Sequence, residues 1–251
     1  MSGHSKWATT KHRKGAQDAK RSKLFSKLSR MITVAAKTGG DPNPENNASL
    51  AAAIAKAKSY SLPKDKIASA IDKAFGAGGG ANYEEVIYEG YGSGGVALYV
   101  EALTDNRNRT AADVRGAFTR AGGSLGATGS VAFQFERRGE IVIEKSAAPD
   151  EEELLLAVMD AGGEDLEDND EEFVVVTGSG DMMSVKNALE VAGIEVKGAE
   201  LSMRPTTPAP VSVETAKKVL RLVDALEESE DVQEVYHNME MTEELAAALD
   251  E

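Results

Sequence analysis

Residues 16–37 read AQDAKRSKLFSKLSRMITVAAK, and this stretch predicts the first helix of the protein. Its apolar residues Leu24, Leu28 and Ile32 recur every four positions, the spacing of an amphipathic helix with one buried face. Such a helix needs partners for its apolar side. We therefore expect it to belong to a folded helical unit, preceded by a short basic arm, residues 1–15.

The same helix carries a basic stripe, which we define as Lys23, Lys27, Arg30 and Lys37. At about 100° per residue these side chains fall on one face beside the apolar one. A solvated helix usually mixes charge signs, because acids and bases four residues apart support each other, and this helix has almost no acids. Of two interpretations, a solvated face and contact with nucleic acid or another polyanion, we favour the second.

Charge is divided unevenly along the chain. The first 37 residues hold ten Lys or Arg against one acid, and residues 1–75 hold 15 basic and five acidic residues. Residues 76–251 hold 13 basic and 37 acidic residues, so the whole chain has a net charge of −14. Such asymmetry is typical of a basic segment that meets a polyanion, carried by acidic modules that repel one.

Several function classes find no support in the sequence. There is no cysteine, and the three histidines His4, His12 and His237 stand at the two ends of the chain, so we expect no catalytic set, no cofactor and no metal site. The acidic run 164–172 lacks the glycine that a calcium loop needs and is predicted to be a solvated loop. No apolar run approaches the roughly 18 residues of a membrane span, and we expect a cytoplasmic protein without a membrane partner.

Turn signals divide the first 80 residues into three helices. Gly39–Pro44 ends the first helix, and Asn46 or Asn47 caps a second that runs to about Ser59. Pro63 is expected at the first position of a third helix, which turns Ile67, Ile71 and Phe75 inward, before a glycine linker at 76–80. The pattern predicts a small helical bundle.

Beyond the linker, strand and helix patterns alternate. Strands are expected at 83–88 and 96–103, followed by a helix that carries Val114 and Phe118 inward. A hairpin of strands 131–136 and 140–145 is predicted around Arg137-Arg138-Gly139, and then helices near 149 and 181–192 with strands at 173–177 and 194–203. The last helix, 213–226, and strand, 232–236, are too short to form a domain alone. We expect them to complete the sheet of residues 83–122, which makes that α+β domain discontinuous.

Two arginines, Arg107 and Arg109, fall at or near the start of the helix that follows Thr104. A helix dipole disfavours cations at that end, by some tenths of a kcal/mol at an exposed site. Either Asp105 and other nearby carboxylates neutralise the arginines, or the arginines bind an anion. The sequence leaves both alternatives open.

The chain resembles the YebC/PmpR family over nearly its whole length. The matching stretches, as they stand in this sequence, are Gly3-His4-Ser5-Lys6-Trp7, Lys11-His12-Arg13-Lys14, Gln17-Asp18-Ala19-Lys20-Arg21, Tyr88-Glu89-Gly90-Tyr91-Gly92, Thr104-Asp105-Asn106-Arg107-Asn108-Arg109-Thr110 and Gln233-Glu234-Val235-Tyr236-His237-Asn238. One departure is Thr9-Thr10, where the family pattern has Asn-Ile. This departure weakens any transfer of contacts within the basic arm.

The resemblance implies an α+β fold of three domains: an N-terminal three-helix bundle, a discontinuous α+β domain, and a ferredoxin-like α+β domain inserted into it. We place these at residues 1–75, at 81–130 with 205–251, and at 131–204. The family is described as probable transcriptional regulators that bind DNA, while other members resemble ribosome-associated factors that bind ribosomal RNA and ease elongation, for example at proline-rich stretches.

The resulting expectation is a non-enzymatic regulator that binds DNA or ribosomal RNA, with the acidic domains as a docking surface for the ribosome or another protein. A protein-interaction adaptor is the alternative from another class; in it the acidic modules recognise the partner, and the basic N-terminal segment, residues 1–37, packs on the protein's own acidic domains. Trp7 and His12 are side chains of the kind that stack on unpaired bases. The residues predicted to contact nucleic acid are Lys6, Trp7, Lys11, His12, Arg13, Lys14, Lys20, Arg21, Lys23, Lys27, Arg30, Arg107 and Arg109.

Overall fold

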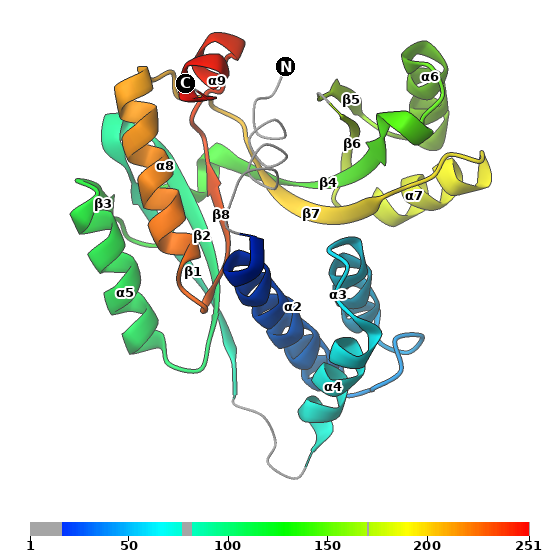
Figure 1. The fold of residues 1–251 in the computed structure, drawn as a ribbon, viewed down its shortest axis with the longest axis horizontal. Helices are drawn as coiled ribbons and strands as arrows, with labels where there is room; N and C mark the ends of the chain where they lie inside the picture. The colour runs from blue at the N-terminus through cyan, green and yellow to red at the C-terminus, as the bar shows by residue number, and fades with distance from the viewer. Residues whose placement is uncertain (1–16, 77–81, 170, 251) are drawn as a thin grey trace.

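The computed structural model describes residues 17–76, 82–169 and 171–250, and it begins with three packed helices. These are α2 (Gln17–Gly39), α3 (Ala48–Ser59) and α4 (Lys64–Phe75), shown at the bottom of Figure 1. Leu28 and Ile32 of α2 are buried against the small residues of α3 and α4, as the helical spacing predicted. Phe75 differs from the prediction, because its side chain is 47% exposed at the end of α4.

The turn between α2 and α3 is held by Asn47, one of the two predicted caps. Its Oδ1 accepts a hydrogen bond from the backbone N–H of Leu50 at 3.0 Å, while its Nδ2 donates to the carbonyl of Ala35 at 3.0 Å. A side chain at Gly39 would come within 2.2 Å of the Asn47 amide. Gly39 and Asn47 together therefore fix the conformation of the turn between α2 and α3. Pro63 lies one position earlier than predicted, at the N-cap of α4.

The first sheet has the order β3-β1-β2-β8, and all its neighbouring strands are antiparallel. Its strands are β1 (Glu84–Tyr91), β2 (Ala97–Thr104), β3 (Ser124–Leu125) and β8 (Val232–His237), and a short 3-10 turn, Ser93–Gly95, joins β1 to β2. Helices α5 (Arg107–Arg120) and α8 (Val213–Glu227) cover one face, where Leu98, Phe118 and Leu222 are fully buried. A last helix, α9 (Glu243–Asp250), was not predicted and adds Leu245 to this core.

The second sheet has the order β5-β6-β4-β7 and is also antiparallel. It comprises β4 (Phe135–Glu144), β5 (Asp165–Asp168), β6 (Glu172–Gly178) and β7 (Gly198–Pro205), with α6 (Glu151–Ala161) and α7 (Met182–Val191) on one face; 3-10 turns at Ala132–Gln134 and Lys145–Ala147 flank β4. The succession β-α-β-β-α-β with this strand order is ferredoxin-like. The α+β fold class is confirmed, whereas the domain boundaries stay a prediction.

The predicted hairpin around Arg137-Arg138-Gly139 is wrong, because residues 135–144 form one continuous strand, β4. A glycine next to charged residues resembles a turn, but Gly139 has a packing role. A Cβ at this position would lie 2.3 Å from Thr177 Oγ1 and 2.6 Å from Met182 Cβ, so only glycine lets α7 approach the sheet. The run 164–172 is likewise no mere solvated loop, since it contains β5 and the buried side chain of Glu167.

Strand β4 belongs to both halves of the molecule. At its start, Phe135 packs on Tyr99 of β2, with ring centroids 5.9 Å apart, in a small cluster between the sheets. Six residues later Ile141 is fully buried in the core of the second sheet. Strand β7 runs antiparallel beside β4 over its length, and Figure 1 shows the two strands crossing from the first sheet toward α6 and α7.

A buried carboxylate fixes the loop that leads into β4. Glu89 accepts backbone N–H bonds from Gly129 at 2.6 Å, Val131 at 2.8 Å and Ala132 at 2.8 Å. Burial alone raises the pKa of Glu89, but the three N–H donors outweigh it and the pKa is lowered. The stabilisation is therefore present above the pKa of an unfolded glutamate, about 4.3, and is lost as pH falls through the folded value.

We expect Glu89→Gln to cost about 2 kcal/mol of unfolding free energy at pH 7, because an amide NH₂ replaces one acceptor oxygen among three donors. Urea unfolding measures this loss. The difference from the native protein should shrink as pH falls below the unfolded value, about 4.3, and through the lower folded value. Glu85→Gln, at an exposed position of the same strand, is the control. A constant difference from pH 7 to pH 3 would contradict the assignment.

Candidate nucleic-acid interface

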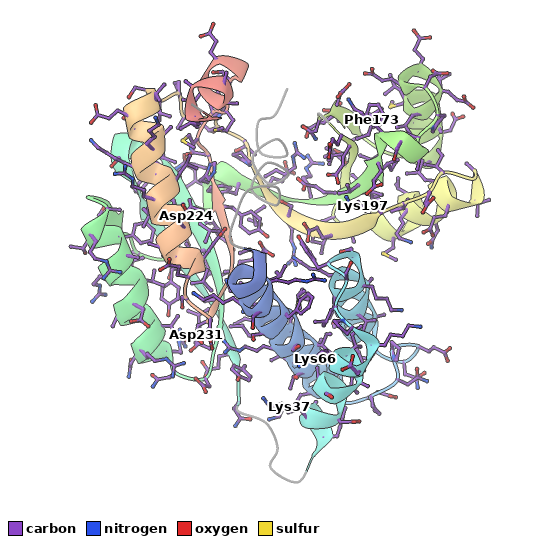
Figure 2. All side chains as sticks on the ribbon, in the orientation of Figure 1. Lys37, Lys66, Phe173, Lys197, Asp224 and Asp231 are labelled. Carbon is purple, nitrogen blue, oxygen red and sulfur yellow. The ribbon has the colours of Figure 1, made fainter. Side chains whose placement is uncertain are left out.

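The basic stripe of α2 lies against the C-terminal end of α8. Lys27 Nζ donates to the carbonyl oxygen of Glu227 at 2.9 Å, and Lys23 Nζ lies 3.5 Å from that of Glu228. The last carbonyls of a helix have no partner within the helix and carry the negative end of its dipole, so lysines are favourable there. Figure 2 shows α2 beside the lower end of α8. Three of the stripe's four residues thus meet an anionic surface of the chain itself; the fourth, Lys37, donates to Asn82 at 2.8 Å.

Arg30 is the most deeply engaged residue of the stripe. Its Nη1 donates to Asp231 Oδ1 at 2.8 Å and to the carbonyl of Glu230 at 2.9 Å, and its guanidinium lies 4.9 Å from the ring centroid of Tyr83. The side chain is 16% exposed. Bonds to two parts of the acidic segment after α8 hold Arg30 in place, so a phosphate would have to displace them.

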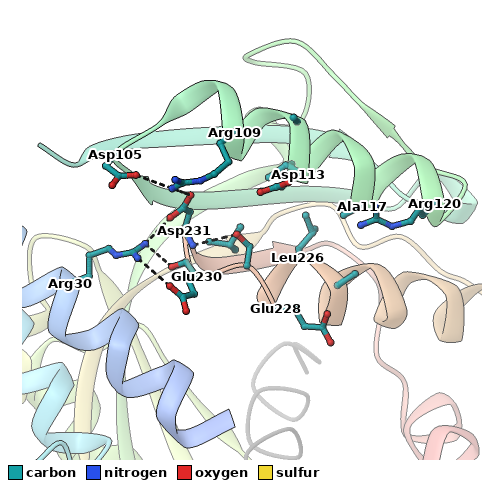
Figure 3. A pocket seen from close by; sticks show the side chains of 15 residues that line it. Arg30, Asp105, Arg109, Asp113, Ala117, Arg120, Leu226, Glu228, Glu230 and Asp231 are labelled. Carbon is teal, nitrogen blue, oxygen red and sulfur yellow. Dashed lines mark hydrogen bonds and ion pairs between the residues drawn. The ribbon is translucent and has the colours of Figure 1, made fainter. Parts of the chain in front are cut away.

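Asp231 joins three elements at one carboxylate. Besides Arg30, it accepts hydrogen bonds from Arg109 Nη2 at 2.9 Å, Thr110 Oγ1 at 2.7 Å and Thr104 Oγ1 at 3.2 Å. Burial alone raises the pKa of Asp231, but the bonds from Arg109 and Thr110 and the charges of both arginines lower it below its ordinary value. Figure 3 shows the carboxylate between the two guanidinium groups.

The two arginines near the start of α5 are paired with carboxylates, which is the first of the two alternatives. Asn106 caps the helix by accepting from the Arg109 N–H at 3.1 Å. Arg109 bonds to Asp105 at 2.8 Å as well as to Asp231, and these bonds raise its pKa. Arg107 lies 3.6 Å from Glu84, and both side chains are largely exposed. Arg109 therefore has a structural function, whereas Arg107 stands at the surface.

An open groove of about 600 Å³ runs between α5 and the C-terminal end of α8 (Figure 3). Its charged lining mixes both signs: Arg30, Arg109, Arg120, Asp105, Asp113, Glu228, Glu230 and Asp231. A phosphate entering this groove would meet carboxylates as well as guanidinium groups. The groove is therefore a poor site for nucleic acid, although it holds three arginines.

The remaining predicted contact residues lie elsewhere. Lys6, Trp7, Lys11, His12, Arg13 and Lys14 fall outside the described residues, and Lys20 lies in the first turn of α2. Arg21 is exposed, with its guanidinium 5.3 Å from the ring centroid of Phe25. The structure thus brings Arg30 and Arg109 together through Asp231. Their contact with nucleic acid stays a prediction.

Sequence reasoning missed a second charged junction, at Lys56 of α3. Lys56 Nζ lies 2.8 Å from Glu200 Oε2 on β7 and 2.8 Å from Glu234 Oε1 on β8, which links the bundle to both sheets. Burial lowers the pKa of Lys56, but the two glutamates outweigh it and raise it well above the ordinary value. The available signal was a lysine beside Ala53 and Ala57, which lie on the buried side of α3. Its partners Glu200 and Glu234 are more than 140 residues away, and nothing in the sequence near Lys56 indicates them.

Neither a metal site nor a membrane span was found in the ranges 17–76, 82–169 and 171–250. No group of three or more acidic or histidine side chains there is arranged to hold a metal ion. No helix in those ranges is both long and apolar enough to cross a membrane.

Comparison with known proteins gives consistent matches along the chain. Residues 5–77 match the model of the TACO1/YebC protein N-terminal domain, and residues 83–239 match the TACO1/YebC second and third domain. A probable transcriptional regulatory protein of Beutenbergia cavernae is 52% identical over 252 residues and is covered completely, as is this chain. Another of that description, from Lactobacillus helveticus, is 54% identical over 237 residues, which cover 94% of this chain and 97% of the relative.

A solved crystal structure has the same fold. It is that of a conserved hypothetical protein from Aquifex aeolicus, with a TM-score of 0.84 and 45% sequence identity, covering 94% of this chain and 97% of the other. Because the two domain models together match residues 5–77 and 83–239, and a relative that is 52% identical covers the full chain, the chain belongs to the TACO1/YebC family.

Proposed function

We propose that the protein is a non-enzymatic regulator of gene expression that binds nucleic acid, and in particular DNA, through the basic arm and the helical bundle. The observation that carries this proposal is the separation of charge in the fold. Residues 1–75 have a net charge of +10, while the rest of the chain has −24. The name of the relatives, probable transcriptional regulatory protein, supports the same function.

Exposed cations of the bundle provide the contact surface for a phosphate backbone. Arg21 stands at the start of α2, continuous in sequence with the arm, and Lys64, Lys66 and Lys73 are exposed on α4. Lys27 and Arg30 contribute less, because α8 and Asp231 already hold them. The surface is therefore the arm and the solvent side of the bundle rather than the stripe itself.

One observation favours a second candidate, a ribosome-associated translation factor that binds ribosomal RNA. Reading duplex DNA directly needs polar side chains that enter the major groove, from a helix or a two-stranded β-ribbon. The basic face of α2 is covered by the end of α8 and is not presented in this way. Contacts from a lysine-rich arm suit phosphate backbones and unpaired RNA bases at least as well.

The salt dependence of binding tests the proposal. If about five phosphates are neutralised, log K falls with log salt at a slope of roughly −4.5 on duplex DNA. Replacing Lys6, Lys11 and Arg13 with glutamine should make that slope shallower by roughly 2.7. The matched control replaces Lys217, Lys218 and Arg221, three cations on α8, and should leave the slope unchanged.

The outcomes separate the candidates. Footprinting at a defined promoter would support DNA regulation, and co-sedimentation with ribosomal particles at physiological salt would support the RNA candidate. Equal slopes for the native protein and the arm variant, on duplex DNA and on ribosomal RNA, would contradict both the DNA candidate and the RNA candidate. They would leave the adaptor, in which the basic stripe serves only to hold α8.

A further inference from the structure

The outer face of α6 carries an apolar stripe, which we define as Leu155, Leu156 and Met159. These side chains are 43%, 67% and 57% exposed, while Leu154 and Val158 of the same helix are fully buried in the core. The spacing i, i+1, i+4 places the three on the solvent side, away from the sheet. Single exposed apolar residues are ordinary, but a contiguous set on one helix face marks an interaction site.

Helix α7 enlarges this apolar surface. It packs with α6 over the same core of the second sheet, and both helices lie at the right of Figure 1, on the opposite side of the molecule from α5 and α8. Met183 and Val191 on α7 are 51% and 90% exposed. The face therefore consists of two adjacent helices that each turn apolar side chains outward.

The charge around this face is almost wholly negative. The two helices with their N-caps, residues 150–161 and 181–191, contain seven acidic residues and one basic residue, Lys186, which is bonded to Glu190 at 2.6 Å. The first turn of α6 holds Glu151, Glu152 and Glu153, and these acids also favour the helix by their position at its N-terminus. The acids beyond that turn have no such function for the helix. An apolar stripe with an acidic rim selects its occupant by charge.

We propose that the outer face of α6 and α7 docks an amphipathic helix of a partner protein whose apolar side is flanked by lysine and arginine. A basic flank complements the acidic rim, and apolar residues at helical spacing fit the stripe. A second copy of this face would bring like charges together, and nucleic acid and anionic lipid would be repelled for the same reason. The site is independent of the nucleic-acid function proposed above.

Titration with two designed peptides tests the site on the full chain. The first is a 14-residue helix with leucine on one side and lysine on the other, and the second has glutamate in place of lysine. We expect only the lysine peptide to bind. The variant Leu156→Ser with Met159→Ser should weaken binding roughly tenfold or more, since apolar anchors dominate such interfaces. Ile87→Ser is the control, since Ile87 is similarly exposed, at 47%, on β1.

Hydrogen exchange identifies where the peptide binds. Protection confined to 151–161 and 182–191 would support the site, and circular dichroism verifies that the serine variant stays folded. Equal affinity of the native protein and the serine variant would overturn the proposal, as would equal binding of the glutamate peptide. Dimerisation lost in the serine variant would also overturn it, because the occupant would then be a second copy.

Discussion

Asp231→Asn should lower the unfolding free energy by about 3 kcal/mol, the lower end of the range for breaking a buried ion pair. The carboxylate accepts from Arg30, Arg109, Thr104 and Thr110, and its side chain is only 7% exposed. Asparagine keeps the shape of the side chain, but its NH₂ group faces one of the groups that donate hydrogen bonds to the native carboxylate. Its neutral amide also leaves Arg30 without a counter-charge. Arg109 is half exposed and regains water, which keeps the loss at the lower end.

Urea unfolding of Asp231→Asn measures this loss, with Asp113→Asn as the control. Asp113 is exposed on α5 and lines the same groove, so its replacement should change stability by no more than about 0.5 kcal/mol. The lowered pKa of Asp231 means that its contribution is present above the unfolded value, about 3.9, and disappears as pH falls through the folded one. Two variants of equal stability would show that the carboxylate does not hold α2, α5 and β8 together.

Lys56→Met should also cost about 3 kcal/mol at pH 7, because it leaves Glu200 and Glu234 together without their shared cation. Glu101 lies close by, and burial and the charge of Glu234 already raise its pKa. The two paired glutamates are 34% and 41% exposed, so solvent limits the loss. Methionine fills the same space, which separates the charge effect from packing.

The pH dependence of Lys56→Met distinguishes a charge effect from a packing effect. With a raised pKa, native Lys56 contributes fully below its unfolded value, about 10.4, and this contribution is lost only as pH rises through the folded value. The loss caused by the variant should therefore be constant at neutral and acidic pH and should shrink only at strongly alkaline pH. Lys58→Met, exposed two residues later on α3, is the control. A loss that stays the same at every pH would point to packing alone.

Local signals predicted local structure well. The spacing of Leu28 and Ile32 predicted α2 and its buried face, and Asn47 was among the two caps proposed for α3. The fold class follows from such patterns together with the resemblance. Gly139 shows the limit, since a glycine that admits α7 and a glycine that turns the chain have the same sequence signature.

The partners of the basic stripe could not be predicted in the same way. The lack of acids four residues away was interpreted as contact of the stripe with nucleic acid or another polyanion, which stays a prediction. In the described structure, Lys23 and Lys27 contact backbone carbonyl oxygens at the end of α8, which no residue type reveals. Arg30 and Asp231 are 201 residues apart, so only the folded sheet brings them together.

The paired strands β4 and β7 have a mechanical consequence. At one end the strand pair lies in the core of the second sheet, and at the other end it packs on β2 through Phe135. A force on α6 or α7 would therefore be transmitted along both strands together. Phe135 packs on the face of β2 that also carries Glu101, near Lys56. Such a force would therefore reach the place where the three parts of the protein meet.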